Sequence, residues 1–179
     1  MPRSFIMKTV IAIMKIIESI NEKIAKITSY CLILLILSLV YEVFARYVFN
    51  APTVWSSDAT YFLCSIAIIF AMAYTWQVGG HVSVDMILVK FPVKVQAFWN
   101  VFFMLTMFFL CWILIVWVMV PNVIESWRIL ERSSIGYFPP IYPYKTWILI
   151  GTFMLVLQGV NVFIKEIYRL IKGKELTVS

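Results

Sequence analysis

Four long, uninterrupted apolar runs alternate with short polar segments along the chain. Each run has about 20 residues or more, enough for a helix rising about 1.5 Å per residue to cross about 30 Å of hydrocarbon. A membrane β-barrel would instead show segments of about ten residues with alternating apolar and polar positions. The pattern therefore predicts an all-α integral membrane protein with four transmembrane helices, at residues 27–49, 57–78, 97–120 and 144–164.

The N-terminal region has a different pattern, typical of an amphipathic helix over residues 4–26 that lies in the membrane interface. Its apolar face carries Ile13, Ile17, Ile20, Ile24 and Ile27, and its polar face carries Lys8, Lys15, Glu22 and Lys26. No glycine or proline occurs between Arg3 and Ala51, so this helix is expected to continue into the first span. It would serve either as a lipid anchor or as a brace against a partner subunit.

Composition and charge agree with membrane insertion and predict an orientation. Hydrophobic residues make up 63% of the chain and charged residues 13%, against about 45–50% and about 25% in soluble domains. The net charge of +6 comes from Lys and Arg that flank the spans, so we expect no nucleic-acid partner. By the positive-inside rule both termini are cytoplasmic. The chain then forms one membrane domain, residues 1–179, with a connection at 121–143 on the side opposite the cytoplasm and a cytoplasmic tail at 165–179. The family resemblance described below implies that this side is the periplasm.

Side chains suited to catalysis or cofactor binding are scarce. The single histidine, His81, cannot supply the two axial ligands that a b-type haem normally needs, and no metal-ligand cluster is apparent. The cysteines, Cys31, Cys64 and Cys111, all lie within spans and are interpreted as small buried hydrophobes. We therefore assign no catalytic, cofactor-binding or metal-binding residue and expect the chain not to be an enzyme.

One cluster joins the end of the first span to the start of the second and consists of Glu42, Arg46, Tyr47, Trp55 and Asp58. A charge at mid-bilayer costs at least about 2.5–3.5 kcal/mol, so such residues usually meet a partner. Glu42 and Arg46 have the four-residue spacing of a helical ion pair, and Asp58 enters the next span at the same level, so two carboxylates are expected to bracket the arginine. We interpret the cluster as a staple between the two helices or as a docking patch for another protein. A route for substrate or ions is the third alternative.

Two further segments place polar residues next to turns. One follows the second span and consists of Gly79, Gly80, His81 and Asp85. Because the glycine pair ends the helix and the next stretch is too short to cross, we expect a cytoplasmic interfacial turn and a short interfacial helix there. The other segment lies in the third connection and consists of Trp127, Arg128, Glu131 and Arg132. It is either an ordinary interfacial helix and loop or a periplasmic docking surface.

Small residues indicate where another helix can approach within the membrane. Ala67 and Ala71 are four positions apart, and Gly151 and Gly159 are eight apart. Each pair falls on one helical face and permits close packing. The approaching helix could belong to this chain or to a partner.

The order of these residues resembles that of the small, four-span membrane subunit (Q-type) of tripartite ATP-independent periplasmic (TRAP) transporters. The likeness is carried by Arg46, Tyr47, Asn50, Pro52, Trp55 and Asp58, by Gly79, Gly80, His81, Val82 and Asp85, by Glu131, Ser133, Pro139, Pro140 and Pro143, and by Gly151, Leu157 and Gln158. It extends over residues 42–159. Two positions depart from the family pattern: Asp58 stands where glutamate is usual, and Gln77 stands near the place of a basic residue.

The resemblance implies a non-catalytic subunit of a sodium-driven transporter that imports an organic acid across the bacterial inner membrane. A periplasmic binding protein would capture the acid, and a large many-span subunit would carry it and hold the substrate and sodium ligands. The small subunit, surrounded by membrane lipids, would scaffold the large one and help dock the binding protein. A membrane anchor of a respiratory or quinone-linked enzyme and a self-assembling channel or exporter are the alternatives.

Overall fold

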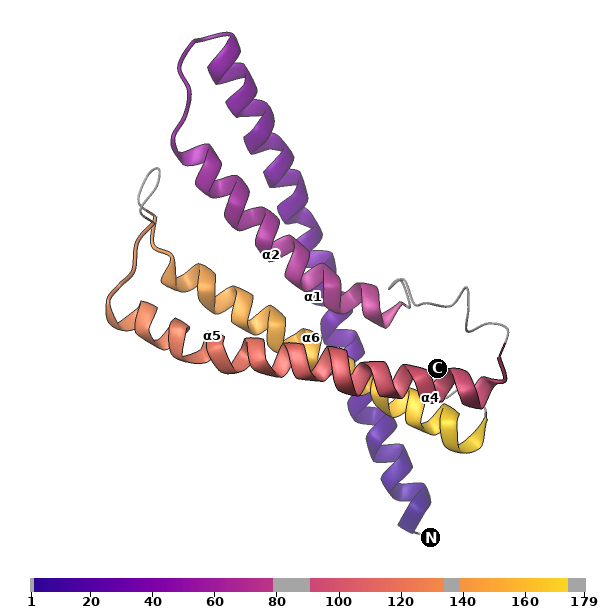
Figure 1. The fold of residues 1–179 in the computed structure, drawn as a ribbon. Helices are drawn as coiled ribbons and strands as arrows, with labels where there is room; N and C mark the ends of the chain where they lie inside the picture. Colours follow the sequence, from indigo (N-terminus) through magenta and orange to yellow (C-terminus); the bar gives the residue numbers. More distant parts are fainter. Residues whose placement is uncertain (1, 79–90, 134–138, 174–179) are drawn as a thin grey trace.

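The computed structural model describes residues 2–78, 91–133 and 139–173, with side chains from Thr9 onward. In these ranges every regular element is a helix (Figure 1), as the all-α prediction requires. The elements are α1 (Pro2–Tyr47), α2 (Trp55–Gln77), α4 (Val93–Phe103), the π-helix η1 (Met104–Phe109), α5 (Leu110–Arg128) and α6 (Tyr142–Lys172). Four stretches are long and apolar enough to cross a membrane, namely Thr9–Tyr47, Trp55–Gln77, Val93–Arg128 and Tyr142–Lys172. The turn predicted at Gly79, Gly80, His81 and Asp85 lies outside the described residues.

Helix α1 is one unbroken helix of 46 residues, as the absence of glycine and proline predicts. At about 1.5 Å per residue it is about 69 Å long, more than twice the thickness of the hydrocarbon layer. After its end at Tyr47, Asn50 adopts a positive φ of 50°, which asparagine tolerates better than most residues. The amide of Ala51 closes this turn by donating a 3.0 Å hydrogen bond to the carbonyl of Ala45.

The side chains with which α1 packs recur at intervals of three and four residues. The seam consists of Met14, Ile17, Asn21, Ile24, Thr28, Cys31, Leu35, Ser38, Glu42 and Ala45, each buried or half-buried. This is the spacing of a left-handed helix pair. The predicted isoleucine stripe only partly coincides with the seam, because Ile13, Ile20 and Ile27 are 52%, 47% and 67% exposed. These three residues form an outward apolar face suited to lipid.

The third crossing is a composite helix that runs from Val93 to Arg128. It starts directly after Pro92, whose ψ of 147° is not helical, and it includes the six-residue π-helix η1. The helix extends beyond the predicted span, so Pro121, expected to open the connection, lies inside α5. Because proline has no amide hydrogen, one intrahelical hydrogen bond is missing at that point.

Helix α6 is the central element, because it contacts α1, α2, α4, η1 and α5. Buried residues between α2 and α6 form the core, namely Ile69, Phe70, Ala73, Met154 and Leu155. A Cβ added at Gly151 would lie 2.7 Å from the side chain of Ile69, and a Cβ at Gly159 would overlap the ring of Phe108. The close approach predicted from these glycines is therefore made by helices of the same chain.

Two helix pairs, α1 with α2 and the composite third helix with α6, cross one another (Figure 1). Their connecting loops point apart, so one end of the molecule is V-shaped, and α1 continues past the crossing to the N-terminus. The segment predicted as a cytoplasmic tail begins as helix, because α6 continues to Lys172 and ends at Gly173, whose φ is 65°. Much of the apolar surface of both pairs is exposed, as expected for helices that meet lipid or a partner.

We expect the substitution Gly159→Leu to lower the free energy of unfolding by roughly 1–3 kcal/mol, because the new side chain must displace the Phe108 ring. That ring also packs on Trp76, with ring centroids 4.0 Å apart, and so has little room to move. Thermal unfolding of the detergent-solubilised protein, followed by circular dichroism, measures the effect. The control is Val160→Leu at the adjacent, 38% exposed position, which should change stability by less than about 0.5 kcal/mol. Equal stability of the two variants would contradict this packing.

Candidate functional site

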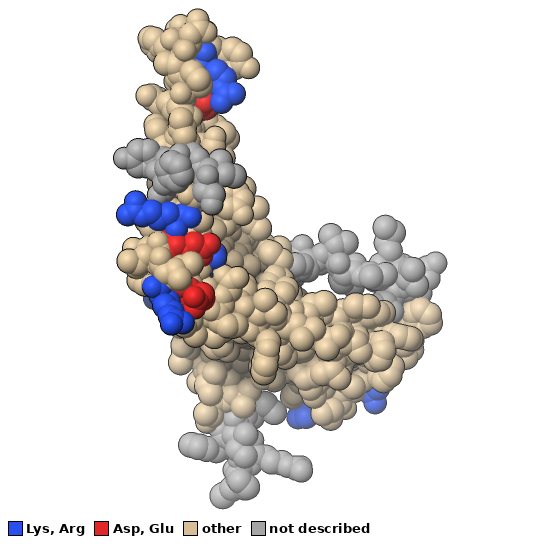
Figure 2. All heavy atoms as spheres, turned by 60° about the vertical axis from the view of Figure 1, so that its left-hand side comes forward, with Lys and Arg blue, Asp and Glu red and all other residues tan. Residues whose placement is uncertain are grey.

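Polar side chains gather at several places on the otherwise apolar helices that the structure describes, among them the following three groups. We call them the Glu42 site (Ser38, Glu42, Arg46, Thr53 and Ser56), the Glu131 site (Asn122, Ser126, Glu131 and Lys145) and the Gln158 site (Glu18, Asn21, Gln158, Asn161 and Lys165). The first two lie at the loop ends of the two helix pairs, where Figure 2 shows acidic and basic side chains gathered together. Polar groups in lipid usually pair with one another or mark a functional site.

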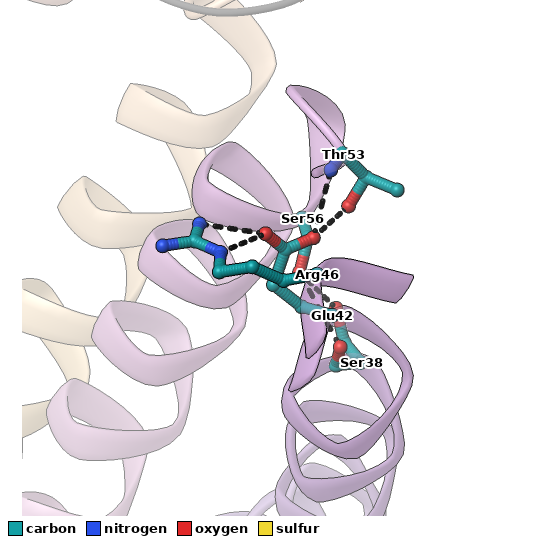
Figure 3. Close-up of polar contacts among 5 residues, drawn as sticks. All are labelled: Ser38, Glu42, Arg46, Thr53 and Ser56. Atoms are coloured by element: carbon teal, nitrogen blue, oxygen red, sulfur yellow. Dashed lines mark hydrogen bonds and ion pairs between the residues drawn. The ribbon is translucent and has the colours of Figure 1, made fainter. Parts of the chain in front are cut away.

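In the Glu42 site one carboxylate ties α1 to the loop before α2 (Figure 3). Its Oε1 accepts hydrogen bonds from Arg46 Nη2 at 2.7 Å and from Arg46 Nε at 3.2 Å, which is the ion pair that the spacing predicts. Its Oε2 accepts the amide of Thr53 at 3.1 Å and also the hydroxyl of Thr53. The side chain of Glu42 is 13% exposed and that of Arg46 is 55% exposed. The carboxylate is therefore used within the chain, whereas the guanidinium also presents surface to the outside.

A buried contact between two serines lies next to this carboxylate. The hydroxyl groups of Ser38 and Ser56 are 3.4 Å apart, and the Ser56 hydroxyl also lies 3.3 Å from the carbonyl oxygen of Ser38. Serine is small enough to let α1 and α2 approach closely at this point. The Glu42 site therefore fixes both the loop and the spacing of the two helices.

The other residues predicted for this cluster lie around the ion pair. Trp55, the first residue of α2, packs against Tyr41 with ring centroids 5.6 Å apart. Tyr47 is 77% exposed. Asp58 lies in the first turn of α2, and the carboxylate paired with Arg46 is that of Glu42. The cluster thus divides into a helix staple and an exposed aromatic rim.

The Glu131 site closes the other helix pair at its loop. The backbone amide of Glu131 donates a 3.0 Å hydrogen bond to the carbonyl oxygen of Ser126. The preceding residue, Leu130, has a positive φ of 50°. The Glu131 carboxylate lies 2.6 Å from Lys145 Nζ and accepts the Ser126 hydroxyl at 2.5 Å. Lys145 Nζ also donates to Asn122 Oδ1 at 2.9 Å. These charge-assisted hydrogen bonds hold the end of α5 against the start of α6, and they keep the pKa of Glu131 below its ordinary value.

The four residues predicted for a docking surface take different positions around this site. Glu131 forms an ion pair with Lys145, and the indole N–H of Trp127 donates a 2.9 Å hydrogen bond to the Thr146 hydroxyl. Both residues therefore link the α5 end of this helix pair to α6. Arg128 has a long 3.7 Å contact to Glu125, and its side chain is 80% exposed. The backbone of Arg132 pairs with Pro140, and the residue is exposed. Arg128 and Arg132 are therefore the members that could meet another protein.

The Gln158 site lies where α1 crosses α6 and was not predicted from the sequence. Asn21 Nδ2 donates to Gln158 Oε1 at 2.8 Å, a bond between residues 137 positions apart. Asn161 Nδ2 lies 3.4 Å from the carbonyl oxygen of Met14 and 3.5 Å from Gln158 Oε1. The residues Met14, Asn21, Gln158 and Asn161 are at most 2% exposed. The site therefore forms a buried polar contact between the two ends of the chain.

An ion pair between Glu18 and Lys165, with a nitrogen–oxygen distance of 2.7 Å, extends this site. The sequence holds a signal for it, because Glu18 and Asn21 are three positions apart on α1 and Asn161 and Lys165 are four apart on α6. Such spacings put each polar pair on one helical face. That the two faces meet depends on the crossing of the helices, which no local pattern specifies.

The geometry of all three sites suits helix association. In each, a carboxylate or an amide binds a side chain from another segment, namely Thr53, Lys145 or Asn21. Within the described ranges there is no group of three or more His, Cys, Asp and Glu residues that could hold a metal ion. Exposed arginines lie in or beside two of these sites, namely Arg46 in the Glu42 site and Arg128 and Arg132 beside the Glu131 site.

Comparison with known families adds an independent finding. A family model described as "Tripartite ATP-independent periplasmic transporters, DctQ component" matches residues 35–172, well over half of the chain. The match includes the whole of the Glu42 and Glu131 sites and the α6 half of the Gln158 site. It begins after Glu18 and Asn21, the α1 half of that site. A search of curated proteins found no match.

The Glu131 site predicts a pH dependence of stability. Lys145 and Ser126 bind the charged carboxylate and so lower the pKa of Glu131 from 4.5. A lowered folded-state pKa means that this stabilisation is complete above the unfolded pKa and is lost as the pH falls through the folded-state pKa. We expect Glu131→Gln to be less stable than the wild type at pH 7 and to lose less stability between about pH 5 and about pH 3.

Thermal unfolding of the purified subunit across this pH range measures the difference. Glu125→Gln is the matched control, because Glu125 is 56% exposed and makes only the 3.7 Å contact to Arg128. The control should follow the wild-type profile. A Glu131→Gln profile parallel to that of the wild type would show that the ion pair contributes nothing measurable.

The Gln158 site predicts energetic coupling between α1 and α6. Asn21→Ala and Gln158→Ala should each destabilise the protein, because each leaves a buried amide without its partner. The double variant should lose less than the sum of the two, with a coupling energy of about 0.6 kcal/mol and at most about 1.7 kcal/mol, the range measured for hydrogen bonds within membranes. Unfolding of the four proteins in detergent with increasing denaturant measures this cycle. Strict additivity of the two substitutions would contradict the hydrogen bond.

Proposed function

The chain belongs to the DctQ component family of the tripartite ATP-independent periplasmic transporters, and from that premise we propose that it scaffolds the large membrane subunit of such a transporter. In this role it is a non-catalytic partner in the sodium-driven import of an organic acid. The large subunit moves the substrate and holds the substrate and sodium ligands. The small subunit widens the stationary part of the assembly in the membrane.

The use of polar groups within the chain is the observation that carries this proposal. At the three polar sites, carboxylates and amides bind side chains or backbone of neighbouring segments. A transporter acting alone would be expected to place polar groups or broken helices around a substrate site near the midplane. The described helices instead present broad apolar surfaces that suit lipid and a membrane partner.

Orientation follows from the number of crossings and the distribution of basic residues. We infer that both chain ends lie on the cytoplasmic side of a bacterial inner membrane, which is supported by the even number of candidate spans and by the concentration of Lys and Arg near the ends and in the second connection. The Glu42 and Glu131 sites are then periplasmic, because successive crossings reverse direction. Exposed Arg128 and Arg132 would face the arriving periplasmic binding protein.

Co-purification tests the scaffold role. We expect the tagged small subunit, expressed in bacterial membranes with the large subunit of its transporter, to purify with it in about equal amounts. Proteoliposomes that contain both subunits should import the organic acid only with a sodium gradient and the binding protein. Isolation of the small subunit with a redox enzyme, or as a homo-oligomer that ignores the large subunit, would contradict the proposal.

We predict that Arg128→Glu and Arg132→Glu slow uptake several-fold, and at most about tenfold, at low salt without reducing co-purification of the large subunit. Charge reversal weakens electrostatic docking of the binding protein, and salt screening should narrow the difference from the wild type. The control is Lys23→Glu, an exposed basic residue on the proposed cytoplasmic side of α1. Uptake unchanged at every salt concentration would contradict the docking role of the two arginines.

A further inference from the structure

A groove runs along one flank of the α1–α2 pair. It consists of two open hollows of about 370 and 700 Å³. The first, which we call the Glu22 hollow, is lined by Glu22–Leu32 of α1 and Ala67–Thr75 of α2. The second, the Arg46 hollow, is lined by Leu39–Tyr47 of α1 and Ser56–Ser65 of α2. Neither hollow is lined by a residue of α4, η1, α5 or α6.

The two hollows belong to the same flank. On α1 their lining residues recur at intervals of three or four and one interval of seven, as Glu22, Ala25, Ser29, Leu32, Leu39, Val43 and Arg46. Residues at such intervals lie on one side of a helix. From Glu22 to Arg46 the groove is about 36 Å long, at about 1.5 Å per residue, which is somewhat more than the hydrocarbon thickness of about 30 Å.

The other side of α2 is already occupied. Ile69, Phe70 and Ala73 of α2 pack on Met154 and Leu155 of α6 in the core. On the groove side, α2 instead carries small and hydroxyl-bearing residues, among them Ser57, Thr60, Cys64, Ala71 and Thr75. Small residues in a membrane allow another helix backbone to approach closely, and hydroxyls can bond across the contact. This flank therefore has the composition of a helix contact.

Polar groups at both ends of the groove call for a partner that can hydrogen-bond. Arg46 uses Nε and Nη2 for Glu42, and its side chain remains 55% exposed. Glu22 and Lys26 form no ion pair with any described residue within 4 Å and stand at the opposite end. A lipid acyl chain offers none of these groups a donor or an acceptor.

We propose that this groove seats one membrane-spanning helix of the large subunit, an inference that rests on the scaffold function proposed above. The chemistry of the groove defines that helix. It carries small or hydroxyl side chains opposite Ala67 and Ala71, a hydrogen-bond acceptor opposite Arg46, and charges complementary to Glu22 and Lys26. A helix of this kind fills the groove over its whole length, from one interface to the other.

The test combines a steric variant with cross-linking in the co-expressed complex. Ala71→Trp fills the groove floor, and because Ala71 is exposed in this chain, the variant should keep the helix content and the Tm of the isolated subunit. We expect it to reduce the co-purified large subunit at least about fivefold, since overpacking a helix contact is strongly unfavourable. The matched control is Leu37→Trp, at a 59% exposed position of α1 that lines neither hollow, which should leave the yield unchanged.

A photoreactive residue placed at the same two positions identifies the occupant. Position 71 should cross-link to a peptide of the large subunit, and position 37 should not. If the wild-type subunits co-purify but position 71 cross-links only to lipid, or Ala71→Trp assembles as well as Leu37→Trp, the groove assignment is overturned and the scaffold function stands. If the wild-type subunits fail to co-purify, both proposals are overturned.

Discussion

In hydrocarbon a polar side chain has no water to bind, and the arrangement of these helices follows from how the chain meets that constraint. Each of the three polar sites bonds one helix to another segment. The carboxylate of Glu42 joins α1 to its loop, that of Glu131 joins α5 to α6, and the amide of Gln158 joins α6 to α1. Two of these contacts close helix pairs, and the third sets where the pairs cross. A further hydrogen bond, from Arg169 Nη2 to Gln96 Oε1 at 3.3 Å, joins α6 to α4.

Close packing depends on small residues at the same contacts. Ser38 and Ser56 let α1 approach α2 closely. The side chain of Ile69 packs against Gly151, and the ring of Phe108 packs against Gly159. Burial of apolar surface brings little gain between helices that are already in lipid, so van der Waals contact at such positions contributes much of the association. This explains why α6, which carries both glycines and the buried amides of Gln158 and Asn161, contacts every other helix that the structure describes.

The resulting protein has few buried side chains and a large apolar exterior. This form agrees with the scaffold role proposed above. The exposed apolar faces of the helices can contact a membrane partner, while the polar side chains bond to one another within the chain. Helix α1 is also unusually long, with 46 residues. It packs on α2 beside the Glu42 site and on α6 at the Gln158 site, so one rigid element joins both helix pairs.

The amino-acid sequence by itself determined the features that depend on local chemistry. The four apolar stretches, the unbroken course of α1, the ion pair of Glu42 with Arg46 and the family resemblance could all be predicted from composition, spacing and the absence of glycine or proline. These features follow from hydrogen bonds and contacts within one or two helical turns. The turn predicted around His81 lies outside the described residues.

The tertiary structure alone decided which helix faces meet. It placed Asn21 against Gln158, included only part of the isoleucine stripe in the seam of α1, and kept Pro121 within α5. It also showed that the partners of Gly151 and Gly159 are internal. The physical reason is that lipid solvates every apolar face about equally well, so hydrophobic periodicity, which identifies the buried face of a soluble helix, does not identify the packing face here. Only long-range geometry distinguishes a face that packs on another helix from a face that meets lipid.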